Sequence, residues 1–120
     1  MALDRNMMVN EYQVQARTTA IYPKAAAVLY PALGLAGEAG ELCNKIKKLV
    51  RDAENFPIQN EKIPDELRAK LVGEIGDTLW YLANLAADLG CNLGMIAEAN
   101  IKKLASRQER GVLKGDGDNR

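Results

Sequence analysis

A helical repeat of apolar residues runs through most of this chain and restricts it to an all-α fold. The repeat is clearest in residues 31–51. Pro31 suits the first turn of a helix, and this helix should end at about Arg51. No segment shows the alternating pattern of a convincing strand. We therefore predict a bundle of about four main helices. The apolar stripe of this second helix comprises Leu35, Ala39, Leu42, Ile46 and Leu49.

The other helices are predicted from the same period and from end signals. Asn10 followed by Gln13 resembles a capping box, so a first helix should run to about Tyr22. Residues 52–64 contain two prolines and no period, which indicates a connecting loop. A third helix is expected over 65–89 and a fourth over 93–110.

Local residues also set the ends and inner faces of the last two helices. Gly90 should end the third helix, Asn92 should cap the fourth, and Gly111 should stop it. Their predicted core faces are Leu67, Leu71, Ile75, Leu82, Ala86 and Leu89 on the third helix, and Leu93, Ile96, Ala97, Ile101 and Leu104 on the fourth.

The size and charge of the chain limit its organisation and partners. Its 120 residues predict one domain over 1–111, followed by a flexible polar tail over 112–120. A chain this short buries a modest core, so self-association is expected. Sixteen basic and sixteen acidic residues cancel, which argues against nucleic acid or a membrane surface as partner.

The apolar segments and the cysteines of the sequence lead to two further expectations. The sequence shows neither a bilayer-spanning apolar stretch nor the apolar segment of a secretory signal, so a cytoplasmic location is expected. Cys43 and Cys91 lie in helical patterns and are predicted to be small buried residues.

Two acidic pairs at helical i, i+3 spacing are the main candidates for a functional site. Glu38 and Glu41 lie beside the apolar stripe of the second helix, and Glu74 and Asp77 lie on the third. Partly buried carboxylates require a compensating positive charge. Because the chain has no histidine, we predict that these four oxygen ligands bind Mg²⁺, with Mn²⁺ as a substitute, for hydrolysis by metal-activated water.

Cationic and amide side chains lie on the same helix edges. Those predicted to contact phosphate groups are Lys45, Lys48, Lys103 and Arg107, and Asn100 lies on the same edge as the last two.

Aromatic residues can stack on a base, although aromatic residues in helices more often belong to the core or an interface. Tyr12 and Tyr81 are the candidates, whereas Trp80 should face away from the acids and pack.

Other interpretations of the acids remain open. A single Glu-x-x-Glu pair usually lies on a solvated face or pairs with lysine, as Glu41 can with Lys45. In that case the chain would be a non-catalytic helical module for self-association or protein binding. A carboxylate-bridged di-iron site would require Glu-x-x-His pairs, which a chain without histidine cannot supply.

Three segments together resemble the MazG-type, all-α nucleoside triphosphate pyrophosphohydrolase superfamily. They are GLAGEAGELCNKIKK, GEIGDTLWYLANLAADLG and EANIKKLASRQERG, and the similarity covers about residues 10–111. Glu38, Glu41, Glu74 and Asp77 match the family's metal motif, and Asn100 with Lys103 resembles its phosphate-contacting element. The stretch 42–73 between the acidic motifs is long for the family.

The resemblance implies hydrolysis of a (deoxy)nucleoside triphosphate between the α- and β-phosphates, with a monophosphate and pyrophosphate as products. Glu38 and Glu41 would then act at the catalytic centre, with Glu41 as the chosen general base. The rival within enzymes is a dUTPase- or dCTPase-like hydrolase that also accepts diphosphates. The resemblance also implies a homodimer or dimer of dimers, and we favour the tetramer.

Overall fold

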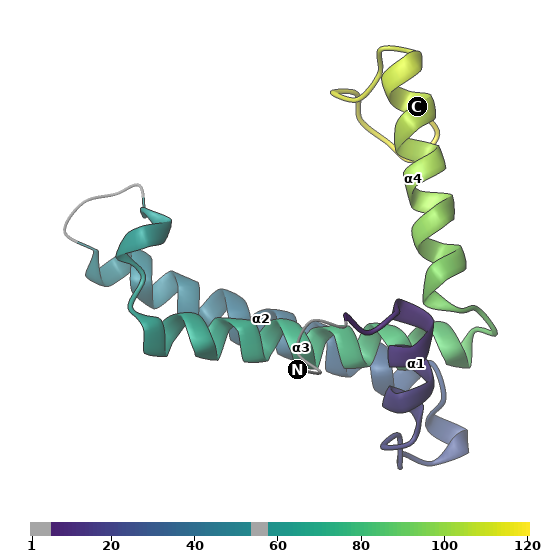
Figure 1. Cartoon of the computed structure of the whole chain (residues 1–120), viewed down its shortest axis with the longest axis horizontal. Helices are drawn as coiled ribbons and strands as arrows, with labels where there is room; N and C mark the ends of the chain where they lie inside the picture. Colours follow the sequence, from purple (N-terminus) through teal and green to yellow (C-terminus); the bar gives the residue numbers. More distant parts are fainter. Residues whose placement is uncertain (1–5, 54–57) are drawn as a thin grey trace.

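The computed structural model describes residues 6–53 and 58–120, and helices dominate both stretches (Figure 1). The four α-helices are α1 (Val9–Arg17), α2 (Leu29–Asp52), α3 (Asp65–Asp88) and α4 (Leu93–Glu109). Short 3₁₀ turns occupy Lys24–Ala26 and Asn60–Lys62. The described stretches contain no strand, so the prediction of an all-α fold with four main helices is confirmed. Part of the predicted loop, residues 54–57, lies outside the described residues.

The helices form a long hairpin with two attachments (Figure 1). α2 and α3 run antiparallel and make the most extensive helix–helix contact. α1 packs against α3, near the end where α4 begins. α4 contacts α1 and then projects away from the α2–α3 hairpin. The hairpin is therefore the only place where two long helices face each other along their length among the described residues. None of the described helices combines the length and apolar character needed to cross a lipid bilayer.

The predicted bounds of α2, α3 and α4 agree closely with the structure, and local chemistry sets the end of α3 and the start of α4. Gly90 has φ of 77°, a left-handed conformation that ends α3 and favours glycine. The Asn92 side chain accepts a hydrogen bond from the Met95 N–H at 2.9 Å and caps α4. These residues act on neighbours in sequence, which is why the sequence alone locates the helix ends.

The predicted bounds of the first helix are wrong at both ends. Asn10 does not cap α1, because its Oδ1 accepts the Gly94 N–H at 2.8 Å, across the fold. The helix begins at Val9 instead, and the Glu11 carboxylate accepts the Met8 N–H. It ends at Arg17 because the Thr18 and Thr19 hydroxyls donate to carbonyl oxygens of its last turn.

Gln13 ties three helices together from a buried position. Its Nε2 donates to the carbonyl oxygens of Ala83 and Cys91, at 3.1 and 3.0 Å. Its Oε1 accepts the Leu93 N–H at 3.1 Å. One amide thereby joins α1 to the end of α3 and the start of α4 and, together with the hydrogen bond from Gly94 to Asn10, holds the direction in which α4 leaves.

The predicted core face of α4 is wrong for a single chain, because this helix projects from the hairpin. Ile101, for example, is 65% exposed. Among the described hydrophobic residues only Ala16, Ala83 and Ala86 are buried. The radius of gyration is 17.7 Å, whereas a compact chain of this length has roughly 13–14 Å. Other predicted core residues that are exposed are Ile46, Ile75, Leu82, Leu89, Ile96, Ala97 and Leu104.

Two further expectations concern the cysteines and the tail. Cys43 and Cys91 are both exposed, so the prediction that they are buried is wrong. Cys43 lies on the outer face of α2, and Cys91 lies on the open connection between α3 and α4. The predicted tail turns back along α4, where Arg107 donates to the Asp118 carbonyl oxygen at 2.9 Å. Its flexibility in solution stays a prediction.

Replacing Gly34 by alanine should destabilise the fold. Tyr81 covers Gly34 so closely that an added Cβ would lie 2.1 Å from the Tyr81 Cε1. The ring must move, and we expect a loss of about 1–3 kcal/mol in the free energy of unfolding. Gly37→Ala is the matched control, because its Cβ would meet nothing within 4 Å, and it should stabilise α2 by up to ~1 kcal/mol. Urea unfolding of both variants measures the difference, and equal effects would contradict the tight contact.

Candidate functional site

The α2–α3 hairpin brings together three of the four predicted metal-binding residues. Glu38 comes from α2, and Glu74 and Asp77 come from α3. One carboxylate oxygen from each residue lies within 4.8 Å of the others. We refer to these three residues as the acidic cluster. Glu74 and Asp77 share one face of α3 because residues three apart lie on adjacent turns.

Glu41 is not part of the acidic cluster, although it lies nearby. Its side chain is 61% exposed, and its Oε2 lies 3.7 Å from the Lys45 Nζ. The same Nζ lies 2.7 Å from the Glu74 Oε1. Lys45 therefore links Glu41 to the acidic cluster and supplies positive charge there. The sequence predicted Lys45 as a phosphate contact, but its described contacts are with carboxylates.

The contacts of the acidic cluster shift the pKa values of Glu38 and Glu74 in opposite directions. A hydrogen bond shared with Glu74 raises the pKa of Glu38, and desolvation and the neighbouring carboxylates add to the effect. The hydrogen bond from Lys45 lowers the pKa of Glu74, and the bond with Glu38 lowers it further. Bonding to Glu74 also raises the pKa of Lys45. Glu38 therefore holds its proton more tightly, and Glu74 less tightly, than an isolated carboxylate does.

The acidic cluster suits a hard divalent cation. Its donors are all carboxylate oxygens, the ligand type that Mg²⁺ prefers. With ligands at about 2.1 Å, opposite oxygens around Mg²⁺ are roughly 4.2 Å apart. The 4.8 Å span of the acidic cluster is therefore within a small side-chain adjustment of that geometry. A raised pKa at Glu38 is also the expected sign of carboxylates gathered without a cation.

Magnesium should stabilise the fold more strongly as pH rises. The pKa of Glu38 is raised above its ordinary value of 4.5. The stability that this group contributes is thus fully present below that value, and is lost as pH rises through its folded-state pKa. Above that window a divalent cation can offset the added negative charge. Thermal unfolding with and without Mg²⁺ should show a larger increase in melting temperature at neutral than at acidic pH.

Glu38→Gln provides the control for that measurement, because it removes the titrating group. The variant should lose most of the pH dependence of the Mg²⁺ effect, and without Mg²⁺ it should be more stable than the parent at neutral pH. An Mg²⁺ effect with the same pH dependence in both proteins would show that Glu38 is not the group responsible.

The other predicted phosphate contacts do not join the acidic cluster within one chain. Lys48 is exposed on α2, three residues after Lys45. Asn100 and Lys103 are exposed on α4, the helix that projects away from the hairpin (Figure 1). Arg107 is 5% exposed, and its described hydrogen bond goes to the tail.

Both tyrosines predicted to contact a base lie near the acids. Burial raises the pKa of Tyr12, and the negative charge of Asp77 raises it further. For Tyr81, burial has the largest effect, followed by Tyr30 and then by Glu38 and Asp77. These effects place the two phenol groups within electrostatic range of the acidic cluster.

Trp80 packs away from the acids, as the sequence predicted. Its indole N–H donates to the Thr19 hydroxyl at 2.8 Å. Its ring meets the Tyr81 ring edge-on, with centroids 5.0 Å apart. Trp80 therefore holds Tyr81 from the side.

Sequence reasoning missed a buried carboxylate at the end of α3. The Asp88 side chain is 1% exposed and pairs with Arg17 at 2.7 Å. Its Oδ2 accepts the Tyr22 hydroxyl at 2.8 Å and the Val28 N–H at 2.9 Å. Burial alone would raise the pKa of Asp88, but these partners outweigh it and hold the pKa below its usual value. An acid in the last turn of a helix opposes the helix dipole, and this was the available sequence signal.

Asp88 holds an unusual turn at the start of α2. Val28 has φ of 68° and ψ of −54°, and the Leu29 N–H donates to the Ala27 carbonyl oxygen at 2.8 Å. This is the classic γ-turn, which is rare and strained. A β-branched residue in this conformation costs about 1–3 kcal/mol, so surrounding contacts must enforce it. The hydrogen bond from Val28 to Asp88 is one such contact.

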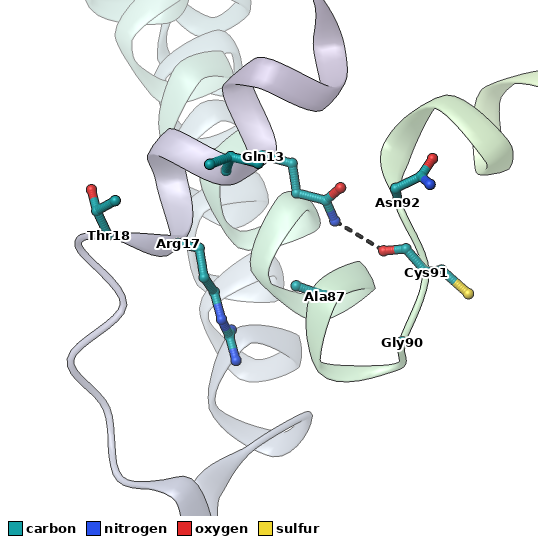
Figure 2. A pocket seen from close by; sticks show the side chains of 8 residues that line it. Gln13, Arg17, Thr18, Ala87, Gly90, Cys91 and Asn92 are labelled. Carbon is teal, nitrogen blue, oxygen red and sulfur yellow. Dashed lines mark hydrogen bonds between the residues drawn. The ribbon is translucent and has the colours of Figure 1, made fainter.

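A groove of about 570 Å³ lies between α1 and the α3–α4 connection (Figure 2). Figure 2 shows the hydrogen bond from Gln13 to the Cys91 carbonyl crossing between its walls. None of the acidic cluster contributes to it. The lining residues are Gln13, Val14, Arg17, Thr18, Ala87, Gly90, Cys91 and Asn92.

Comparisons with known proteins match most of this chain. A family model described as "MazG nucleotide pyrophosphohydrolase domain" matches residues 30–112, which include all of α2 after its first residue, and the whole of α3 and α4. The Gene 37 protein of Mycobacterium phage L5 is 43% identical over 120 residues, which cover 95% of this chain and 100% of that protein. No solved structure matches the chain.

Proposed function

Because the chain belongs to the MazG nucleotide pyrophosphohydrolase domain family, we propose that it hydrolyses a (deoxy)nucleoside triphosphate between the α- and β-phosphates. The observation that carries this proposal is the acidic cluster, in which three carboxylates from two facing helices lie within 4.8 Å of one another. Triphosphates bind to proteins largely through divalent cations shared with carboxylates. The cytoplasmic location expected from the sequence remains a prediction.

The metal-binding residues in this proposal are Glu38, Glu74 and Asp77, with Glu41 at their edge. Bound Mg²⁺ or Mn²⁺ supplies positive charge for the phosphate oxygens and makes water more acidic. A metal bound there would favour the ionised form of Glu38 and so oppose the rise in pKa that its neighbours cause. Lys45 can then turn from Glu74 toward the incoming phosphates, as the sequence predicted.

Glu41 is the general base in this mechanism. It is exposed beside the acidic cluster and lies outside the three-residue ligand group, so its carboxylate can accept a proton once Lys45 has turned toward the phosphates. The water oxygen forms a bond to the α-phosphorus while its proton passes to Glu41. The bond from the α-phosphorus to the oxygen bridging to the β-phosphorus breaks, and pyrophosphate leaves. Tyr12 and Tyr81 provide aromatic surface for the base next to this centre.

We also propose that the functional protein is a homo-oligomer, with a tetramer favoured over a dimer. The exposed apolar face of α4 and the large radius of gyration leave a single chain poorly packed. Asn100, Lys103 and Arg107 are candidates for phosphate contact, but α4 carries them away from the hairpin of its own chain. In an oligomer these groups can approach the acidic cluster of another copy.

Chromatographic analysis of reaction products tests the proposed reaction. The purified chain is incubated with canonical and modified nucleoside triphosphates and diphosphates, with and without Mg²⁺ or Mn²⁺. Metal-dependent formation of monophosphate and pyrophosphate is the expected result. Turnover of diphosphates as well would favour the dUTPase- or dCTPase-like alternative, and release of orthophosphate from triphosphates would contradict α–β cleavage. No turnover of any nucleotide would favour the non-catalytic interaction module.

A further inference from the structure

A row of tyrosines connects the buried Asp88 to the acidic cluster. The rings of Tyr22 and Tyr30 stack with centroids 4.8 Å apart. Tyr30 lies next to Tyr81, with centroids 6.3 Å apart and planes tilted by 48°. The Tyr81 ring lies against Gly34, one helical turn before Glu38 on α2, and the charge of Glu38 raises the pKa of Tyr81. We refer to Tyr22, Tyr30 and Tyr81 as the tyrosine row.

Asp88 fixes the far end of this row through two separate contacts. Its Oδ2 accepts the Tyr22 hydroxyl, which sets the first ring. The same oxygen accepts the Val28 N–H, which sets the turn leading into α2 and therefore the position of Tyr30. Both rings of the stacked pair thus depend on one carboxylate.

Arg17 adds a second connection from Asp88 to Tyr81. Its guanidinium pairs with Asp88 and also donates to the Asn84 Oδ1 at 3.3 Å. The Asn84 amide donates to the Trp80 carbonyl oxygen at 3.1 Å, and the Trp80 ring packs edge-on against Tyr81. The Tyr81 ring is therefore positioned by contacts with both Trp80 and Tyr30.

We propose that Asp88, together with Arg17, is a positioning residue that fixes the tyrosine row and thereby the nucleotide-contacting face of Tyr81. The proposal rests on the proposed function, because it assigns Tyr81 to nucleotide binding. Asp88 reaches no member of the acidic cluster through its described contacts. Its loss should therefore weaken nucleotide binding and leave metal binding intact.

Asp88→Asn tests this proposal, with the emission of Trp80 as a direct readout. Trp80 is the only tryptophan and touches Tyr81, so its fluorescence reports the position of that ring without any substrate. We expect a changed emission spectrum, a rise in KM of about tenfold and a kcat within about twofold of the parent. The affinity for Mn²⁺ in the absence of nucleotide, measured by calorimetry, should be unchanged.

Two further variants separate positioning from general loss of stability. Tyr22→Phe removes one donor to Asp88 but keeps the stacked ring, so it should change KM in the same direction by a smaller factor. If Asp88→Asn does not fold, the emission and KM of Tyr22→Phe are compared with those of the parent instead. Ala69→Gly lies in the second turn of α3, away from Asp88, and lowers helix stability through backbone propensity alone. It should leave both the emission and KM unchanged.

The outcomes distinguish this inference from the proposed function. Unchanged Trp80 emission would overturn the inference, and so would changed emission with an unchanged KM. A KM that rises equally in Ala69→Gly would also overturn it, because any loss of stability would then suffice. If the parent turns over no nucleotide, the proposed function fails, while Trp80 emission still decides whether Asp88 fixes the tyrosine row.

Discussion

Glu38→Gln and Glu74→Gln should each reduce nucleotide turnover by at least about 100-fold. Replacing residues that only support a metal ligand typically costs 10–100-fold in affinity or activity, so losing a ligand itself should cost more. Each substitution keeps the shape of the side chain but removes one of the three charges of the acidic cluster. Initial rates at saturating Mg²⁺ and nucleotide measure the effect, alongside the Mg²⁺ concentration needed for half-maximal rate.

Glu66→Gln is the matched control for these two variants. Glu66 lies on α3 like Glu74, but its side chain is 85% exposed and pairs only with Lys70 in the described contacts, at 3.2 Å. It should retain parental turnover, and all three variants should keep parental helix content by circular dichroism. Loss of helix content in the Glu38 and Glu74 variants would assign the acidic pairs to folding instead of catalysis.

The proposed oligomer should dissociate to monomers and lose most of its activity in the Ile101→Glu variant. Ile101 lies on the exposed apolar face of α4, and a charge placed in an apolar interface costs several kcal/mol. Each 1.4 kcal/mol is a factor of ten, so the dissociation constant of the assembly should rise by at least about 100-fold. Light scattering coupled to size-exclusion chromatography gives the mass, and turnover is measured at the same protein concentrations.

Ala99→Glu introduces the same charge on the other side of α4. At about 100° per residue, positions 99 and 101 are about 200° apart around the helix, and Ala99 lies near Glu98 and Lys102. This variant should keep the parental mass. An Ile101→Glu protein with unchanged mass would refute an interface on this face, and a fully active monomer would show that the site needs no second copy.

The parts of the fold that were predictable depend on residues close together in sequence. The ends of α3 and α4 were predicted correctly because Gly90 and Asn92 act within one helical turn. The acidic pairs were predictable because i, i+3 spacing places both acids of a pair on one face. Bringing Glu38 next to Glu74 needed only that α2 and α3 pack as neighbours.

The parts that were missed depend on contacts between distant residues. Asn10 has the right chemistry for a cap, but Gly94 uses its side chain instead. The partners of Asp88 come from α1 and from the start of α2, and no periodicity indicates them. The apolar face of α4 was predicted to lie in the core, but the helix projects from the hairpin and Ile101 is 65% exposed, because no local signal says which helices a given face will meet.

α4 is held near its start by Gln13, so a small rotation there moves its far end by a large distance. Its seventeen residues span about 25 Å at 1.5 Å per residue. A rotation of about 10° at the Gly90–Asn92 connection would move its far end by roughly 4 Å, more than a hydrogen-bond length. The three hydrogen bonds of one glutamine amide therefore govern how accurately groups far along α4 can be delivered to a neighbouring molecule.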